Sequence, residues 1–397
     1  MKTKASSVRI LILTADAGFG HRSAAIAVAE ALRLNYGASV ELNIVNPLNS
    51  EWAPSILRDS QEDYDRWVKQ VPELYKLAYE ASDLFIPTRV MEDTLGTLLF
   101  DAIEKAFTEN NPDVVLNTYP MYQAAITQFQ SNLQKKAPVF TVVTDLATIH
   151  RIWFHKEVDG FLVPNHIVAK LAVSNQVPAE KVCVTGIPVH PDISRESRAP
   201  EQIRAALGWE TGITSILAVG SRRSKKLLDM LHIVNHYGAP LQLAVVAGKN
   251  ESLYTQLQQV NWHIPVHIYD FVDNMPSLMK ASDLVISKAG GLIITESLAC
   301  GRPLILTEII PGQETGNAEY VKAAKAGVVV NTPLEMLESL HHLLVNDHEL
   351  LKQYTQHALA IGKPESAFTI ADILWQAAHG QAGCKTSSDG PDPYKGS

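Results

Sequence analysis

The hydrophobic positions of this chain fall into short apolar runs that are separated by longer mixed segments. Apolar runs of this length, bounded by glycine, proline or polar turns, predict buried strands. In the first half they lie at residues 8–14, 40–45, 114–117, 139–144 and 160–163. In the second half they lie at residues 216–219, 241–246, 266–269, 284–287, 303–306 and 327–330. Short strands that alternate with helical segments predict an α/β protein with parallel sheets and right-handed crossovers.

The helical segments complete the expected architecture. They lie at residues 23–34, 49–109, 124–133 and 366–379, and the last one is expected to cross back to the first domain. Residues 1–190 are predicted to form one Rossmann-like domain, 191–200 a Pro-, Ser- and Arg-rich linker, and 201–379 a second such domain, with a disordered tail over 380–397. We expect the two domains to face a cleft, with ligands at the carboxyl ends of the strands.

Length, charge and composition exclude several classes of protein. The 397 residues are too many for one ordinary core, and 46% hydrophobic with 19% charged residues is typical of a globular chain. A net charge of −8 and a pI near 6.0 argue against nucleic-acid binding but leave a membrane-surface role open. The first apolar run leads into a glycine turn, which indicates a strand and not a signal peptide, and no run reaches the length of a spanning helix. Three widely spaced cysteines predict reduced thiols without a metal pattern.

The most informative segment runs from Asp283 to Leu306. A short strand is followed by the turn Gly290-Gly291, and a helix from about Leu292 carries Glu296. Free backbone N–H groups and the positive end of the helix dipole suit a phosphate there. A carboxylate one turn further along can accept both hydroxyls of a ribose, and Pro311-Gly-Gln-Glu314 supplies polar groups for a sugar. The segment therefore predicts a nucleotide-sugar site.

The first strand leads into Gly18-Phe19-Gly20 and then His21. The third glycine of a dinucleotide fingerprint is Ser23 here, and the second strand ends in Asn46-Pro47 without an acid, so the fingerprint is weak. Two interpretations of His21 stay open. It either caps a helix in an ordinary turn, or it lies at the ligand edge, where its near-neutral pKa suits it to accept a proton from an attacking hydroxyl.

Asp145 ends another strand and also has two interpretations. It either caps a turn, or it orients His21 or acts as the base itself. His150 and His155 lie close by in the sequence, but no third metal ligand accompanies them, so satisfied polar histidines are the prediction.

Two loops of the second half carry further candidates. Gly220-Ser-Arg-Arg-Ser-Lys-Lys226 either clamps a diphosphate with N–H groups and cations or is a solvated basic loop. The backbone at Phe271 and Val272 either contacts a base edge or belongs to an ordinary loop. In the first half, Trp52, Trp67, Tyr75, Tyr79 and Phe85 occupy the helical region over 49–109, as core residues or as a membrane-facing surface.

Six ordered motifs resemble the glycolipid synthases of glycosyltransferase family 28, a group that includes monogalactosyldiacylglycerol (MGDG) synthases and bacterial diacylglycerol glucosyltransferases. The resemblance runs from about Val8 to Leu374. It is carried by Gly18-x-Gly-His21-Arg22, Thr144-Asp-Leu146 with Trp153-Phe-His155, Gly186-Ile-Pro-Val189, Phe271-Val-Asp-Asn-Met-Pro276, Ser287-Lys-Ala-Gly-Gly291 and Pro311-Gly-Gln-Glu314 with Asn317.

The resemblance implies a GT-B fold and an inverting hexosyl transfer to diacylglycerol, with UDP-galactose favoured as the donor and UDP-glucose as the alternative. It also implies a peripheral, cytoplasmic location on a membrane, with anionic lipids as further partners. It implies His21 as the catalytic residue, supported by Asp145. The implied donor residues are Gly220, Ser221, Arg222, Phe271, Val272, Lys288, Ala289, Gly290, Gly291, Leu292, Glu296, Gln313, Glu314 and Asn317. The implied acceptor or lipid side comprises Gly18, Phe19, Gly20, Tyr119, His150 and Trp153.

Departures from the family pattern and missing motifs bear on how the donor is bound and on the stereochemistry of transfer. The basic loop after Gly220 replaces a glycine-rich diphosphate loop, and Phe19 stands where glycine is common. No Asp-x-Asp motif ends a strand, so no cofactor and no obligatory metal are expected. The Glu-x7-Glu pair of retaining enzymes is missing, because its second position is Leu304.

Three alternatives stay open at this stage. They are transfer to another lipid acceptor, a non-transferase enzyme of the same fold such as a UDP-N-acetylglucosamine 2-epimerase, and a silent binding module. Gln313 and Glu314 suit either epimer of the donor hexose, and the sequence does not predict the oligomeric state.

Overall fold

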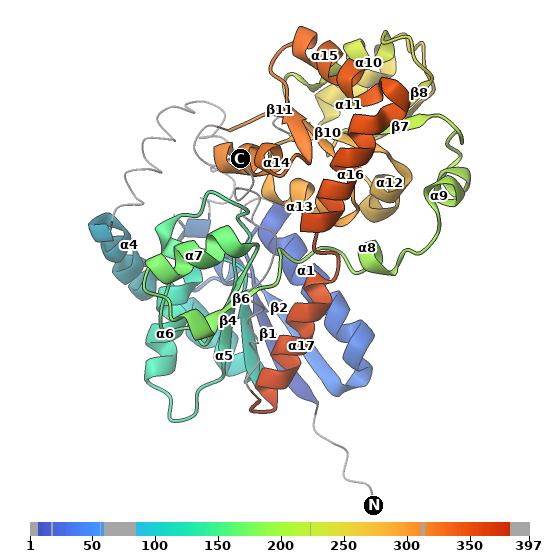
Figure 1. Cartoon of the computed structure of the whole chain (residues 1–397). Coiled ribbons are helices and arrows are strands. Elements are labelled where there is room, and N and C mark those ends of the chain that lie inside the picture. Colours follow the sequence, from blue (N-terminus) through green and yellow to red (C-terminus); the bar gives the residue numbers. More distant parts are fainter. Residues whose placement is uncertain are drawn as a thin grey trace, which may run out of the picture. The chain divides into compact units, whose positions relative to one another are not determined.

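The computed structural model describes residues 7–16, 19–55, 57–58, 85–222, 224–310 and 314–381. The chain divides into two compact units (Figure 1). One unit runs to Pro191 and takes up the chain again from Glu365, and the other is Asp192–Pro364. The expected linker contains a helical turn, α8 (Asp192–Arg195), which belongs to the second unit. Residues 382–397 and the aromatic positions Trp67, Tyr75 and Tyr79 lie outside the described residues.

The first unit has a parallel six-stranded sheet in the order β2-β1-β3-β4-β5-β6. Its strands are β1 (Val8–Leu13), β2 (Val40–Val45), β3 (Val114–Asn117), β4 (Val139–Val142), β5 (Gly160–Val163) and β6 (Val182–Val184). Its helices are α1 (Phe19–Tyr36), α4 (Phe85–Leu98), α5 (Phe100–Asn110), α6 (Gln123–Ser131), α7 (His166–Ser174) and α17 (Ser366–Ala378), with short 3-10 turns η1 (Gly37–Ser39), η2 (Pro47–Asn49), η3 (Pro120–Tyr122), η4 (Arg151–Trp153) and η5 (Ala179–Lys181). The long helical segment expected over 49–109 is interrupted at Leu99, between α4 and α5.

Alternation along β1 explains why this sheet has helices on both faces. Ile10 and Ile12 pack with residues of α1 and α17, whereas Leu11 and Leu13 face the core that contains α5 and α6. Successive side chains of a strand point to opposite faces, so a continuously apolar strand requires cover on both sides. Helix α17 supplies part of that cover and runs beside α1 (Figure 1). The stacked rings of Tyr36 and Trp375, 4.1 Å apart, fix this contact.

The second unit repeats the architecture, with a parallel sheet in the order β12-β11-β10-β7-β8-β9. Its strands are β7 (Thr214–Val219), β8 (Leu241–Val246), β9 (Val266–Tyr269), β10 (Leu284–Lys288), β11 (Leu304–Glu308) and β12 (Gly327–Val329). Its helices, besides α8, are α9 (Pro200–Leu207), α10 (Leu227–Asn235), α11 (Glu251–Gln259), α12 (Met275–Ala281), α13 (Gly291–Ala299), α14 (Thr315–Ala323), α15 (Pro333–Leu344), and α16 (Glu349–Ile361), which follows the 3-10 turn η6 (Asn346–His348).

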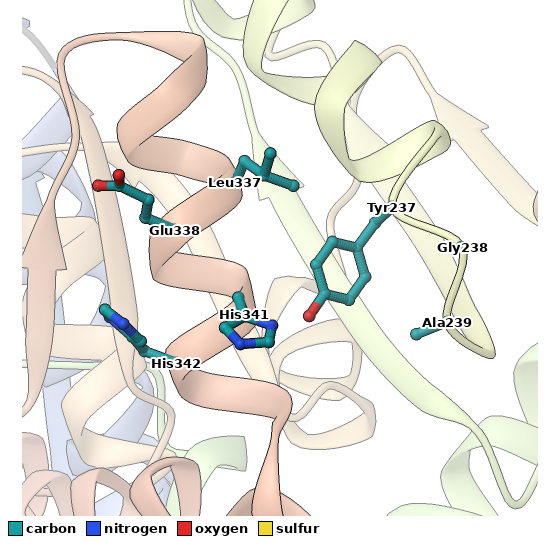
Figure 2. A pocket seen from close by; sticks show the side chains of 7 residues that line it. All are labelled: Tyr237, Gly238, Ala239, Leu337, Glu338, His341 and His342. Atoms are coloured by element: carbon teal, nitrogen blue, oxygen red, sulfur yellow. The ribbon is translucent and has the colours of Figure 1, made fainter.

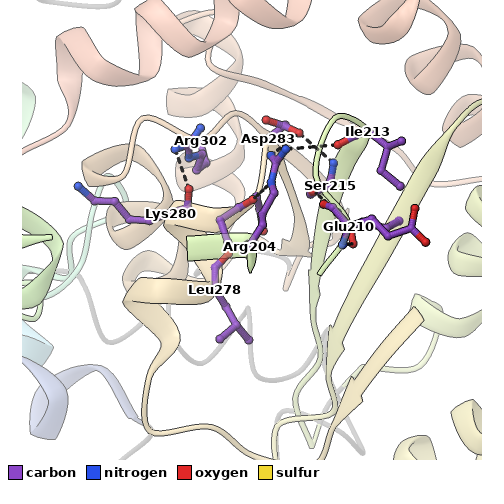
Figure 3. Close-up of polar contacts among 11 residues, drawn as sticks. Arg204, Glu210, Ile213, Ser215, Leu278, Lys280, Asp283 and Arg302 are labelled. Atoms are coloured by element: carbon purple, nitrogen blue, oxygen red, sulfur yellow. Dashed lines mark hydrogen bonds and ion pairs between the residues drawn. The ribbon is translucent and has the colours of Figure 1, made fainter. Parts of the chain in front are cut away.

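A polar network closes the amino-terminal edge of this second sheet (Figure 3). The buried guanidinium of Arg204 donates to Asp283 Oδ2 at 2.8 Å and to the carbonyl oxygens of Ala281 and Ile213 at 2.6 and 3.3 Å. Asp283 Oδ2 also accepts from the backbone N–H of Ser215 at 2.8 Å. Helix α9 is thereby joined to the starts of β7 and β10, so the network is structural and lies away from the ligand edge.

The predicted start of helix α1 needs correction. Helix α1 begins at Phe19 and not near Ser23, so Gly20 and His21 lie in its first turn. The first turn of a helix has no intrahelical acceptors for its N–H groups, so a glycine is tolerated there. The buried, free Cys300 agrees with the expectation of reduced thiols.

Candidate active site

Three neighbouring strands of the first sheet bring candidate residues together at their carboxyl ends. His21 follows β1, Thr118 follows β3, and Thr144 and Asp145 follow β4. Strands β1, β3 and β4 are adjacent, and the order reverses at β1, which is the switch point where ligands bind in open parallel sheets. The sequence prediction that His21 and Asp145 lie at one edge is thus met by the topology.

The imidazole of His21 is held at one nitrogen. Nδ1 lies 2.7 Å from the carbonyl oxygen of Thr118 and 2.9 Å from Thr144 Oγ1. A carbonyl oxygen can only accept, so Nδ1 carries the hydrogen and donates it to Thr118. In the neutral ring Nε2 then has a bare lone pair. This is the tautomer that a general base requires.

Burial keeps His21 neutral. It lowers the pKa of His21 to about 4, while the hydrogen bond to the Thr118 carbonyl acts in the opposite direction. The ring meets Tyr119 edge-on, with centroids 5.0 Å apart, and lies 6.0 Å from the Trp153 ring. Among the candidate acceptor residues, Tyr119 therefore contacts His21 directly. Gly18 lies outside the described residues.

Asp145 makes a different contact from the one expected. Its Oδ2 accepts from Trp153 Nε1 at 2.7 Å, and no hydrogen bond among the described residues joins it to His21. Burial raises the pKa of Asp145 to about 6, and the bond from Trp153 opposes that shift. The expectation of direct support for His21 is corrected to an indirect one, in which the Trp153 indole lies between the two side chains.

Trp153 and His150 are also placed more deeply than acceptor-facing residues would be. Trp153 is only 1% exposed, so it packs behind His21 in the core of the first unit. His150 is buried, and its Nδ1 accepts from the backbone N–H of Ile152, which caps η4. Within the described residues, no group of three or more His, Cys, Asp or Glu side chains is arranged to hold a metal.

The donor candidates gather at the carboxyl edge of the second sheet. Strand β10 ends at Lys288, and Gly290 is the N-cap of α13. No described side chain caps this helix, so its first N–H groups are open to an anion. Asn317 donates to the carbonyl oxygen of Ala289 at 3.0 Å and fixes the turn. Glu314 is buried against Lys288, and Gln313 lies outside the described residues.

Glu296 is a carboxylate without a counter-charge. It lies in the second turn of α13, after Gly291 and Leu292, and burial alone raises its pKa to about 7. No ion pair or hydrogen-bond donor satisfies this side chain among the described residues. An uncompensated carboxylate is costly in a folded protein and frequently marks a ligand site.

The basic loop is already engaged within the second unit. The backbone N–H groups of Lys225 and Lys226 both donate to Glu308 Oε1, at 2.6 and 2.7 Å. Ser221 N–H donates to Ser224 Oγ, and Arg222 is exposed. A Cβ on Gly220 would lie 2.7 Å from the Leu253 side chain and 3.1 Å from the Ala247 carbonyl, so glycine serves packing there. The expected use of loop amides for phosphate is therefore corrected for Lys225 and Lys226, which Glu308 occupies, while the donor role of Gly220, Ser221 and Arg222 stays a prediction.

Phe271 and Val272 follow β9, as predicted for a base-binding loop. The Phe271 ring is 47% exposed, and Lys249 Nζ lies 4.2 Å from its centroid. Thr118, Glu308 and Lys249 were not singled out from the sequence, and Thr144 was named only as part of a motif. Their position just after predicted strands was the available signal, but their partners are distant in sequence.

An open pocket elsewhere in the second unit contains none of these residues. It is lined by Tyr237, Gly238 and Ala239, which precede β8, and by Leu337, Glu338, His341 and His342 of α15 (Figure 2). It therefore lies at the amino-terminal end of β8, away from the strand ends that carry the candidates. Of the helices in the described part of the chain, none has both the length and the apolar character to cross a membrane.

Sequence comparison identifies relatives across both units. Residues 21–189 match the family model of monogalactosyldiacylglycerol (MGDG) synthase, and residues 216–366 match that of the glycosyltransferase family 28 C-terminal domain. The chain is 31% identical to monogalactosyldiacylglycerol synthase 3, chloroplastic, from Arabidopsis thaliana, over 91% of this chain and 79% of that protein. It is 30% identical to the enzyme named monogalactosyldiacylglycerol synthase, chloroplastic, from Spinacia oleracea, over 93% and 72%.

Solved structures share the fold at low identity. MurG from Acinetobacter baumannii superposes with a TM-score of 0.59 at 15% identity, over 93% of this chain and 99% of that one. MnaA from S. aureus, solved with UDP, gives 0.61 at 16%, over 96% and 100%. The predicted α/β architecture is confirmed, and the fold is GT-B.

Proposed function

Because this chain belongs to the monogalactosyldiacylglycerol synthase family, we propose that it transfers galactose from UDP-galactose to the 3-hydroxyl of diacylglycerol, with inversion. The chain is a GT-B hexosyltransferase, and the donor and the acceptor are the proposed part. The observation that carries the chemistry is the His21 tautomer, since Nδ1 donates to Thr118 and Nε2 is left bare. UDP-glucose is the alternative donor.

The proposed reaction is a single displacement. The acceptor oxygen attacks the anomeric carbon and forms the new glycosidic bond as the bond to the departing UDP breaks. Nε2 of His21 takes the hydroxyl proton, and UDP leaves with the bonding electron pair. The open N–H groups of α13 stabilise the charge that develops on the diphosphate. We propose that these groups suffice without an obligatory divalent ion.

Attachment to the membrane is proposed to be peripheral. The acceptor is a lipid, and Trp52 in the first unit is 51% exposed, with Lys105 Nζ 5.4 Å from its ring. An exposed tryptophan beside a lysine suits the interface between lipid and water. Anionic lipids are proposed as further partners from the family resemblance alone, since Lys105 is itself paired with Glu51 and Glu109.

Product analysis tests this function directly. Purified protein is mixed with liposomes that contain diacylglycerol, and with UDP-galactose or UDP-glucose in separate reactions. We expect a monogalactosyl lipid by chromatography and mass spectrometry, with the same yield in EDTA. A glucolipid would change the donor. Loss of product in EDTA would contradict the metal-independent mechanism, and no glycolipid from either donor would contradict the function.

Glu296 is proposed to accept the ribose hydroxyls of the donor. Glu296→Gln should weaken UDP binding roughly 10–100-fold, because two charge-assisted hydrogen bonds lose their charge. The same change should raise the free energy of unfolding by about 1–3 kcal/mol at pH 8, since it removes an uncompensated carboxylate. The folded pKa near 7 lies above the ordinary value of 4.5, so this gain is complete above pH 7 and disappears as the pH falls toward 4.5.

Calorimetry and denaturant unfolding measure both effects. Hydroxyl donation to the carboxylate lowers its pKa, so UDP binding near pH 7 should release protons, which calorimetry in buffers of different ionisation enthalpy detects. Glu319 is an exposed residue of α14, and Glu319→Gln provides the control that should change neither quantity. Unchanged UDP affinity in Glu296→Gln would remove Glu296 from the donor site.

A further inference from the structure

A buried ion pair lies at the carboxyl edge of the second sheet. Lys288 Nζ is 2.7 Å from Glu314 Oε1, and the two side chains are 25% and 6% exposed. Lys288 is the last residue of β10, and Glu314 is the residue before α14. Leaving either charge alone in this environment would be costly, so each side chain is fixed by the other.

Both carboxylate oxygens of Glu314 have partners within the protein. Oε1 is on Lys288, and Oε2 accepts from the backbone N–H of Ile310 at 3.1 Å. The sequence prediction placed Glu314 against the donor hexose. A buried carboxylate with both oxygens engaged is poorly suited to accept sugar hydroxyls. It is well suited to hold a cation in one place.

The place where Lys288 is held is the turn before α13. A Cβ built on Gly290 would lie 3.2 Å from Lys288 Nζ and 3.3 Å from Lys288 Cε. Gly290 has φ −73° and ψ 139°, which any residue adopts, so backbone conformation does not require glycine there, and a Cβ would press on the flexible end of Lys288. The missing side chain lets the ammonium group lie over the turn, beside the open N–H groups of the helix.

We propose that Glu314 is a positioning residue that holds the Lys288 ammonium over the Gly290 turn, where Lys288 binds the diphosphate of the donor, and that Glu314 does not touch the hexose. An ammonium group has three N–H donors, and Glu314 uses one of them. The others remain for phosphate oxygens. This inference rests on the proposed use of a UDP-sugar.

The basic loop supports this assignment because its amides are engaged elsewhere. The N–H groups of Lys225 and Lys226 are bound to Glu308, so they are not available to a phosphate. Lys288 also pairs with Glu308 in the register of β10 and β11. Among the described residues of this edge, Lys288 is therefore the cation that has both a fixed position and an adjacent open helix N-terminus.

Binding of uridine, UDP and UDP-galactose to the full-length protein separates the possible roles. Lys288→Met should lower the affinity for UDP roughly 10–100-fold, the range of a lost charge-assisted hydrogen bond. It should leave the affinity for uridine unchanged, because uridine has no phosphate. Glu314→Gln should also lower the affinity for UDP. It should leave the ratio of UDP-galactose to UDP affinity unchanged. The double variant should be no weaker than Lys288→Met, because both changes remove one interaction.

The opposite pattern would overturn the proposal. If Glu314→Gln keeps wild-type UDP affinity but weakens UDP-galactose, Glu314 contacts the hexose directly. If Glu314→Gln fails to fold, Gly290→Ala replaces it. Its Cβ would press on the ammonium at 3.2 Å and shift it by a few tenths of an ångström without backbone strain. The affinity for UDP should therefore fall and that for uridine should not, and unchanged UDP binding would contradict the placement of Lys288. A wild-type protein that binds no UDP would instead contradict the proposed function itself.

Discussion

Replacing His21 by alanine should lower kcat by roughly 10²–10⁴-fold, the contribution of a positioned general base. The reason is the hydrogen bond from Nδ1 to the Thr118 carbonyl, which leaves Nε2 to accept the acceptor's proton. The affinity for UDP should not change, because the proposed donor residues belong to the second unit. Initial rates with liposomes at saturating donor, together with calorimetry of UDP binding, measure the two quantities.

Thr144→Val provides a matched control for this result. It removes the hydroxyl 2.9 Å from Nδ1 but keeps the stronger acceptor, the Thr118 carbonyl, so the loss should be much smaller than for His21→Ala. Near-wild-type turnover in His21→Ala would exclude His21 as the base. Asp145 would then be the next candidate.

The pH dependence of kcat distinguishes these two candidates. A base works only when deprotonated, so activity is lost as the pH falls through its pKa. With a pKa near 4, His21 predicts a flat kcat down to about pH 5, whereas an essential Asp145 carboxylate predicts a loss near pH 6. Trp153→Phe removes the hydrogen bond that lowers the pKa of Asp145. If Asp145 is the base, the loss of activity should therefore shift to higher pH in this variant. If His21 is the base, the pH profile should not shift.

Much of the fold was predictable because each strand is a local pattern. The run Val40–Val45 and the segment Leu241–Val246 are strands at the residues expected, since apolar runs bounded by turn residues carry that information within themselves. The α1 boundary was wrong because helix starts depend on capping contacts, and Gly20 argued locally for a turn. Sequence patterns also predicted which edge of each sheet carries the polar residues.

The partners of the site residues were not predictable in the same way. Thr118 is 97 residues from His21, and it acts through its carbonyl oxygen, which every residue possesses. Its role has no signature in the side-chain sequence. Likewise, Trp153 resembled an acceptor contact but is buried between Asp145 and His21, because the η4 turn folds it inward.

The basic loop illustrates a third limit. Its lysines and arginines suggested phosphate binding, but the loop amides are satisfied by Glu308, 82 residues beyond Lys226. A glutamate at the end of β11 is an equally good anion for two N–H groups. The charge composition of the loop therefore did not predict this partner, a carboxylate at the end of β11, because the bonds are made by backbone N–H groups.

Arg204→Ala should lower the free energy of unfolding of the second unit by about 3–5 kcal/mol, the range for a buried ion pair that loses one partner. The change leaves Asp283 without its paired cation, although Arg302 stays nearby, and leaves the carbonyl oxygens of Ala281 and Ile213 without their donor (Figure 3). Urea unfolding, with hydrogen exchange to locate the loss at β7 and β10, measures this effect.

Arg198 provides the control, because it forms an exposed ion pair with Glu196 in the same unit and its removal should have little effect. Under native conditions, Arg204→Ala should keep its UDP affinity, since Asp283 precedes β10 and Lys288 ends it. A selective loss of UDP binding with unchanged stability would contradict this division. We infer that β10 carries an anchoring network at its amino-terminal end and a separate donor site at its carboxyl end. That result would show that the two are coupled.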